Sequence, residues 1–151
     1  MEIERFNYRD IQDVSTLLAD CVPYVLPHHP YIYWIMGEYF PSLCFIAKEN
    51  DSILGFICAL YSAEKKSIFI WQLAVSKAHR RKGLAVLLCD KIVEYANNNK
   101  INSIQMTIND ENTASLTFFS RFSKQHSKTF EKITLSGINS FKGENAYEIK
   151  L

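Results

Sequence analysis

A basic turn in the middle of the sequence has the residue types and spacing to bind an anion. It reads Arg80-Arg81-Lys82-Gly83 and lies between an apolar run that ends at Val75 and a segment with apolar residues every four positions. Backbone N–H groups at the start of a helix lack partners within that helix, and the helix dipole adds partial positive charge. Small residues such as Gly83 and Ala85 let a phosphate approach this backbone closely. The turn therefore predicts a pyrophosphate site, with a solvated basic turn as the alternative.

The elements around this turn indicate a mixed α/β sheet. Strands are predicted from apolar or β-prone runs, and helices from apolar residues at helical spacing. The predicted strands are about 2–7, 43–48, 53–61, 67–75, 104–108, 130–135 and 146–151, and the predicted helices are about 10–18, 31–40, 83–97 and 113–122. This order favours a central sheet of about six to seven strands with helices on both faces. The whole chain, 1–151, is expected to be one domain.

Local features refine this prediction. The run 67–75 lacks strict alternation, so it predicts a central strand buried on both faces. Gly55 predicts a bulge within its strand, and Asp10 is predicted to cap the first helix. The segment 22–30 contains three prolines, which exclude a regular helix there.

Composition and charge exclude several classes of protein. The chain has 151 residues, of which 48% are hydrophobic and 22% are charged, and its formal net charge is +1. This is enough apolar material for one core, and the near-zero charge predicts neither a nucleic-acid partner nor an acidic membrane partner. The N-terminal segment lacks the apolar core of a signal peptide, and no apolar run reaches the ~20 residues of a membrane span. A cytoplasmic protein is therefore expected.

The cysteines favour the same compartment. Cys21, Cys44, Cys58 and Cys89 form no C-x-x-C pair, and their spacing does not suit a metal site. They are predicted to be reduced core thiols, which fits a reducing cytoplasm. No metal is expected.

Two segments resemble the GCN5-related N-acetyltransferases. The first is Gln72-Leu73-Ala74-Val75 followed by Arg80-x-x-Gly83-x-Ala85, and the second is Asn112-Thr113-Ala114-Ser115-Leu116-Thr117-Phe118-Phe119. The resemblance implies the GNAT fold, in which a central strand splays from its neighbour, and acetyl-CoA as the co-substrate. The turn would bind the pyrophosphate of CoA, the strand would pair with the pantetheine arm, and the asparagine would contact it. The residues expected to bind acetyl-CoA are Leu73, Ala74, Val75, Arg80, Arg81, Lys82, Gly83, Leu84, Ala85, Asn112, Ser115 and Phe118.

One position departs from the family pattern. The last aromatic of the second segment is often a tyrosine that protonates the departing CoA thiolate. Here it is Phe119, which has no proton to give. Either another group donates the proton, or the thiolate, whose parent thiol has a pKa of ~8.5, leaves unprotonated.

Further segments resemble one branch of that family, the L-2,4-diaminobutyrate acetyltransferases of ectoine biosynthesis. They are Tyr31-Ile32-Tyr33, the strand 69–75, the basic turn, Asn112-Thr113-Ala114-Ser115 and Phe118-Phe119, and the likeness spans roughly residues 22–122. That branch has an acidic loop, close to D-x-N-S, before its Y-x-Y pair. Here the loop reads Leu26-Pro27-His28-His29-Pro30, without a carboxylate. Diaminobutyrate is therefore one candidate acceptor beside other small amines, such as an amino acid or an amino sugar.

The implied reaction needs a base and a donor to the oxyanion. An amine is mostly protonated at pH 7, so a base must take its proton, directly or through water. A late glutamate serves as base in the resembling branch, which favours Glu144 over Glu148, with a surface role as the alternative for both. His28 is another candidate base, because its charge changes near neutral pH. The oxyanion donor is expected to be a backbone N–H of the central strand, at Leu73 to Val75.

Four side chains are candidates to bind the acceptor. Trp71 lies on the central strand, Tyr31 and Tyr33 lie in the early aromatic segment, and Thr107 lies on the adjoining strand. Packing in the core is the alternative for the aromatic residues.

Three functions are compatible with these motifs. The first is direct acetyl transfer from acetyl-CoA to a small amine. The second is a module that binds acyl-CoA without catalysis, which Phe119 and the missing acidic loop support. The third is a protein or peptide N-acetyltransferase, although the proline-rich segment 22–40 resembles a lid over a small pocket. The resemblance also implies a possible homodimer.

Overall fold

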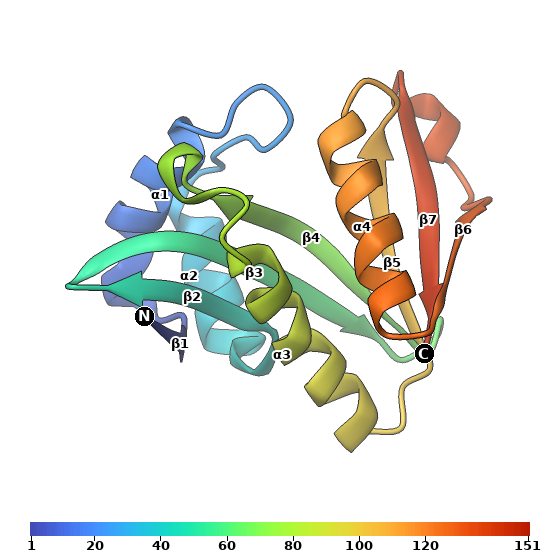
Figure 1. Cartoon of the computed structure of the whole chain (residues 1–151), viewed down its shortest axis with the longest axis horizontal. Coiled ribbons are helices and arrows are strands. Elements are labelled where there is room, and N and C mark those ends of the chain that lie inside the picture. Colours follow the sequence, from blue (N-terminus) through green and yellow to red (C-terminus); the bar gives the residue numbers. More distant parts are fainter. The chain divides into compact units, whose positions relative to one another are not determined.

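Seven strands form one mixed sheet in the order β1-β2-β3-β4-β5-β7-β6, as Figure 1 shows for the computed structural model, which describes residues 1–151. The strands are β1 (Glu2–Arg5), β2 (Cys44–Glu49), β3 (Ser52–Ser62), β4 (Ser67–Val75), β5 (Ser103–Asn109), β6 (Thr129–Ile133) and β7 (Glu144–Lys150). The main helices are α1 (Ile11–Ala19), α2 (Pro30–Tyr39), α3 (Leu84–Asn98) and α4 (Thr113–Gln125). β4 and β5 run parallel, whereas β1–β2, β2–β3, β5–β7 and β6–β7 are antiparallel. The expected mixed sheet is confirmed.

The chain divides into two compact units. The first comprises residues 1–60 and 71–95, and the second comprises residues 61–70 and 96–151. β4 contributes to both, because its first residues lie in the second unit and Trp71 onward lies in the first. Pairing between β4 and β5 is short and joins Ile68–Ile70 with Ile104–Met106, which agrees with the expected splayed strand pair. The assignment of the whole chain to one domain stays a prediction.

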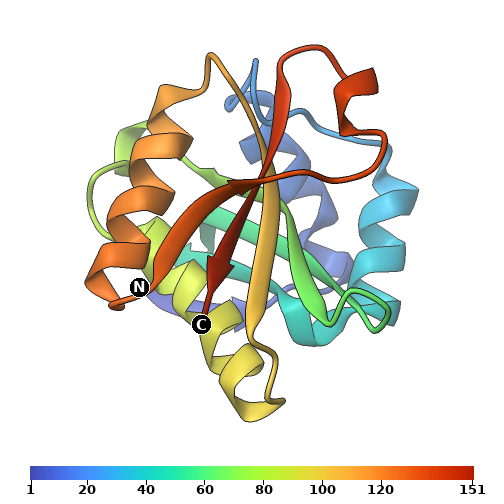
Figure 2. The same cartoon turned by 90° about the vertical axis from the view of Figure 1, so that its right-hand side faces the viewer.

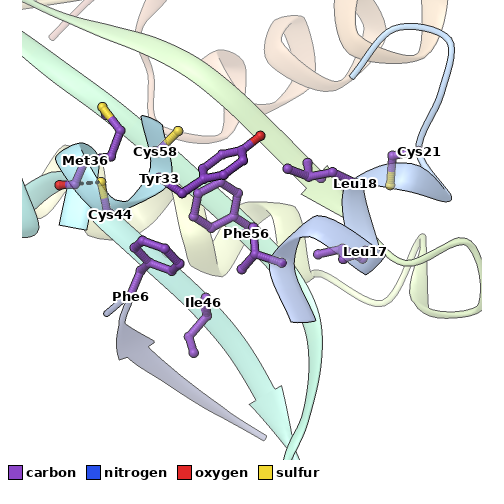
Figure 3. Packing of buried hydrophobic residues seen from close by; sticks show 12 residues of the cluster. Phe6, Leu17, Leu18, Cys21, Tyr33, Met36, Cys44, Ile46, Phe56 and Cys58 are labelled. Atoms are coloured by element: carbon purple, nitrogen blue, oxygen red, sulfur yellow. Dashed lines mark hydrogen bonds between the residues drawn. The ribbon is translucent and has the colours of Figure 1, made fainter. Parts of the chain in front are cut away.

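In the first unit, helices cover both faces of β2 and β3. Cys44 pairs with Cys58 and Ile46 with Phe56, and these side chains form one core with α1 and α2. Figure 3 shows Tyr33 of α2 beside Phe56 in this cluster. The alternate residues of the two strands face α3, which lies over the opposite face in Figure 1. The period of two along each strand therefore supplies apolar side chains to both layers.

The bulge predicted at Gly55 is present. Ala47 pairs with Gly55 and the next residue, Lys48, pairs with Ile53, so Leu54 is the extra residue.

The predicted cap of α1 is wrong in one respect. Asp10 stands at the N-cap position but makes no side-chain bond to α1; its carboxylate instead accepts the Asn7 N–H at 2.9 Å in the preceding 3-10 turn.

In the second unit, α4 packs on β6 and β7 through aromatic rings, and Figure 2 shows these elements from the side. The ring of Phe119 stacks on Phe130 at 6.3 Å between centroids, and Phe130 stacks on Tyr147 at 5.1 Å. Ile104, Met106 and Ile108 of β5 are buried, while the alternate residues of that strand are half-buried. The sheet of this unit therefore has one apolar face and one polar face.

None of the helices has the length and hydrophobicity that a membrane span requires. All four cysteines are buried free thiols, as predicted.

The close approach of β3 and α3 at Gly55 gives a test of the packing. An ideal Cβ on Gly55 would lie 3.0 Å from Leu88 Cδ1 and 3.4 Å from the Ala47 Cβ. Gly55→Val should therefore lower the free energy of unfolding by about 1–3 kcal/mol through overpacking, measured by urea denaturation. The penalty should shrink in a Leu88→Ala background. An equal penalty in both backgrounds would show that this contact does not exclude a side chain.

Candidate functional site

The basic turn places unpaired backbone donors at the start of α3. Gly83 adopts φ +82°, and its carbonyl accepts the first helical bond, from the Leu87 N–H at 3.1 Å. The N–H groups of Gly83, Leu84 and Ala85 have no acceptor within the chain. A Cβ on Gly83 would meet no atom within 4 Å, so the space above the turn is open. These features fit an anion held against the helix start.

The side chains of the turn add full positive charge. Arg80, Arg81 and Lys82 are exposed. The two ion pairs of the chain, Met1–Glu49 and Lys91–Glu94, lie elsewhere, so none of the three cations is neutralised by a carboxylate. Arg81 has φ +63°, the left-handed region that favours glycine. The turn is therefore an unneutralised cationic loop beside the unpaired N–H groups.

The end of β4 is fixed to its surroundings by hydrogen bonds. The Val75 carbonyl accepts from Arg80 Nε at 3.3 Å and from the Cys21 thiol at 3.7 Å. The Ser76 N–H donates to the carbonyl of the bulged Leu54 at 2.8 Å. These bonds set where the strand stops and where the basic turn begins. Leu73 and Val75 are half-buried and Ala74 is buried.

A buried polar network joins α2 to β4. The Tyr33 hydroxyl donates to Gln72 Oε1 at 3.0 Å and accepts the His28 N–H at 3.0 Å. Gln72 Nε2 donates to the Leu26 carbonyl at 2.7 Å. The His28 ring lies 4.7 Å from the Trp71 ring, and the Tyr33 ring lies 6.2 Å from it. The structure thus brings together His28, Tyr33 and Trp71, three of the residues that the sequence singled out.

The two tyrosines of the Y-x-Y pair differ in environment. Tyr33 is 0% exposed, and burial raises the pKa of its phenol above the ordinary 10, so the hydroxyl keeps its proton. Tyr31 is 61% exposed and stacks on Trp34 at 5.9 Å, away from this network. His29 Nδ1 accepts the Tyr31 N–H at 3.2 Å and so caps α2. An acceptor-binding role of either tyrosine stays a prediction.

The polar face of the second unit carries two of the predicted residues. Thr107 pairs with Ala146 and Asn109 pairs with Glu144, so these side chains share one face of β5 and β7. Asn109 Nδ2 donates to Glu144 Oε1 at 3.5 Å. Thr107 and Glu144 are half-buried. The carboxylate of Glu144 therefore shares a face with Thr107 and accepts one hydrogen bond, from Asn109, an arrangement compatible with a base.

Sequence reasoning gave no role to the network around Glu148. Its Oε2 accepts from Ser103 Oγ at 2.7 Å and from Gln105 Nε2 at 3.0 Å. The Ser103 hydroxyl also lies 2.9 Å from that of the buried Ser67. The bonds from Gln105 and Ser103 lower the pKa of Glu148 below its ordinary 4.5. The register of the strands, which pairs Gln105 with Glu148, is the signal that a single sequence lacks.

The second motif forms the start of α4. Asn112 Oδ1 accepts the Ser115 N–H at 3.1 Å, so the asparagine side chain caps α4 and the backbone N–H of Ser115 is its donor. Phe118 is half-buried and packs on Phe122 at 5.8 Å. Phe119 is buried in the aromatic layer on β6, where its ring stacks on Phe130. No group of three or more His, Cys, Asp or Glu side chains could hold a metal ion.

The Glu148 network predicts a pH-dependent stability. A carboxyl whose folded pKa is lowered stabilises the fold above its unfolded pKa, and this contribution is lost as the pH falls through the folded value. Glu148→Gln should therefore destabilise the protein at pH 7, and the difference from wild type should shrink below about pH 4, measured by urea denaturation. The exposed Glu64 provides the control Glu64→Gln. An equal loss of stability at both pH values would contradict hydrogen bonds that depend on the charge of the Glu148 carboxylate.

The chain matches a known family over most of its length. A model of the acetyltransferase (GNAT) family matches residues 11–123. The L-2,4-diaminobutyric acid acetyltransferase of Halalkalibacterium halodurans is 31% identical over 117 residues, which are 77% of this chain and 62% of the relative. The relative of the same name from Marinococcus halophilus is 34% identical over 96 residues, which are 63% of this chain and 56% of the relative. The chain thus spans about three fifths of the length of these curated relatives.

Solved structures share the fold. Diaminobutyrate acetyltransferase EctA from Paenibacillus lautus, in complex with L-2,4-diaminobutyric acid and coenzyme A, has a TM-score of 0.88 and 28% identity, covering 99% of this chain and 93% of that chain. Ard1 from Thermoplasma volcanium has a TM-score of 0.76 at 21% identity, covering 99% and 97%, a likeness that shows the fold alone. The GNAT fold expected from the two motifs is confirmed. The family match contains the basic turn and the Asn112 segment, and the chain belongs to the acetyltransferase (GNAT) family.

Proposed function

We propose that this chain transfers the acetyl group of acetyl-CoA to the primary amine of a small molecule. The observation that carries the proposal is the start of α3, where one turn combines three unpaired N–H groups, three exposed cations without a carboxylate partner and an open position at Gly83. Membership of the acetyltransferase family supports the same donor. The relatives that act on diaminobutyric acid support a small acceptor.

In this proposal the pyrophosphate of acetyl-CoA is held by the turn. The N–H groups of residues 83–85 would bind the phosphate oxygens, and Arg80, Arg81 and Lys82 would supply the opposing charge. Leu73, Ala74, Val75, Asn112, Ser115 and Phe118 stay the predicted contacts of the pantetheine arm. The Asn112 oxygen already accepts one hydrogen bond as the cap of α4, which leaves its amide nitrogen as the unused donor.

The transfer would proceed directly from donor to acceptor. The amine nitrogen attacks the thioester carbonyl, so a C–N bond forms, the C–S bond breaks and the electron pair leaves on the thiolate. Glu144 is the proposed base, with His28 as the second candidate, and takes the proton from the attacking amine. The backbone N–H of Val75 would stabilise the oxyanion. Phe119 lies buried among aromatic rings and offers no proton, so the thiolate leaves as the anion or takes a proton from another group.

The acceptor is proposed to be a small amine. Tyr31, Tyr33, Trp71 and Thr107 stay its predicted contacts, with His28 as a candidate base. L-2,4-diaminobutyric acid is the first compound to test, because the similar EctA structure contains it. The loop before Tyr31 carries no carboxylate to hold a second ammonium group, which keeps other small amines as candidates.

Two further properties belong to this proposal. The four buried free thiols support a reducing compartment, for which we propose the cytoplasm. The homodimer implied by family resemblance stays a prediction, which the molar mass measured by light scattering would test.

The acceptor prediction is tested with a panel of amines. Purified protein is incubated with acetyl-CoA and with diaminobutyrate, other diamino acids, polyamines and amino sugars, and the products are identified by mass. We expect one acetylated small amine to dominate. Binding of acetyl-CoA without any product across the panel would contradict the proposed transfer to a small amine and favour a protein substrate or a non-catalytic module.

The donor site is tested by Gly83→Glu. The new carboxylate should fill the open position and repel phosphate, so calorimetry should detect no acetyl-CoA binding. The matched control is Gly137→Glu, because Gly137 has φ +79° and equally open space. The control carries the same backbone strain and charge and should bind like wild type. Normal acetyl-CoA binding by a folded Gly83→Glu variant would show that the basic turn is not part of the donor site.

A further inference from the structure

The loop of residues 22–29 is joined to β4 by side chains rather than by strand pairing. Its Leu26 carbonyl accepts from Gln72 Nε2 at 2.7 Å, and its His28 N–H donates to the Tyr33 hydroxyl at 3.0 Å. Val25 packs against the core of the first unit, whereas Leu26 and His28 are both exposed. These two hydrogen bonds therefore hold the exposed part of the loop, around Leu26 and His28, over the strand.

Gln72 is linked to both bonds, directly at Leu26 and through the Tyr33 hydroxyl at His28. It is 6% exposed, and its Oε1 accepts the proton of the Tyr33 hydroxyl while its Nε2 reaches the loop. The amide can adopt only this orientation, because a flipped amide would set its oxygen against the Leu26 carbonyl. The Tyr33 hydroxyl then has its lone pair directed at the His28 N–H. One buried amide thus fixes two points of the loop.

The loop carries a ring that depends on this anchoring. The His28 ring lies 4.7 Å from the ring of Trp71, which is half-buried. Trp71 precedes Gln72 in β4, so the strand that presents the indole also holds the loop that covers it. Release of the loop would leave the Trp71 ring more accessible and the imidazole without a fixed position.

We propose that Gln72 is a positioning residue that sets the acceptor specificity by holding the 22–29 loop, and with it the His28 ring, against Trp71. This inference rests on the proposed function, since it assigns the loop to acceptor recognition. Gln72 acts through Leu26 and Tyr33 and contacts no reactant. Its side-chain bonds reach the loop and α2 and none reaches the basic turn, so we expect their loss to leave pyrophosphate binding unchanged.

The first test separates acceptor from donor kinetics. Gln72→Met keeps the length and volume of the side chain but removes both polar ends. It should lower kcat/KM for the acceptor by about tenfold or more, the order expected for a lost buried hydrogen bond, with KM affected more than kcat. The acetyl-CoA dissociation constant should not change. Gln12→Met, at an exposed position of α1, is the matched control and should equal wild type.

A second variant covers the case in which Gln72→Met does not fold. Tyr33→Phe keeps the ring in the core and removes only the hydroxyl that links Gln72 with His28. It should raise the acceptor KM and, in a Trp34→Phe background, increase acrylamide quenching of Trp71, a change that loss of a direct acceptor contact alone would not produce. An unchanged acceptor KM in a folded variant, or an equal loss of acetyl-CoA binding, would overturn the proposal.

The position of the loop is also measured without turnover. In a Trp34→Phe background Trp71 is the only tryptophan. Acrylamide should quench its fluorescence more strongly in Gln72→Met than in the parent, and Gln12→Met should match the parent. Equal quenching would overturn the anchoring role even if no acceptor had been found. Increased quenching with unchanged acceptor kinetics would overturn only the role in specificity.

Discussion

The first unit depends on one constraint, which is that the buried amide of Gln72 needs a hydrogen-bond partner at each end. An amide placed in an apolar strand is costly unless both of its ends are bonded, and here a phenol and a loop carbonyl complete it. The same pair of bonds explains why Tyr33 is a tyrosine in a core that otherwise takes apolar rings. Because one side chain serves strand, helix and loop together, the three cannot shift independently.

Much of the fold follows from the sequence because its patterns are local. The apolar runs that form β2 and β3 and the spacing by four after Gly83 require only neighbours along the chain, and both gave elements close to those observed. Gly55 indicated the bulge for the same reason. Asp10 was misassigned because its carboxylate could bond either to α1 or to the preceding turn, and in the structure it accepts the Asn7 N–H.

The basic turn was predicted from the sequence, whereas the hydrogen-bond networks of Gln72 and Glu148 were not, and the reason is physical. The basic turn is one continuous segment, so its backbone donors and charges could be inferred together. The partners of Gln72 lie 46 residues and 39 residues away in sequence, and those of Glu148 lie 45 residues and 43 residues away. Such pairs arise from register and helix docking, which a single sequence does not specify. A lone amide within the apolar run 67–75 was the one signal that could have indicated the Gln72 network.

The backbone at Arg81 has a consequence for engineering. A non-glycine residue at φ +63° costs roughly 1–2 kcal/mol, which glycine would avoid. The chain nevertheless places a guanidinium there, beside the unpaired amides of α3. Selection of variants for heat tolerance alone would therefore favour loss of this arginine, and a thermostabilised protein obtained in that way would lose part of its cationic loop.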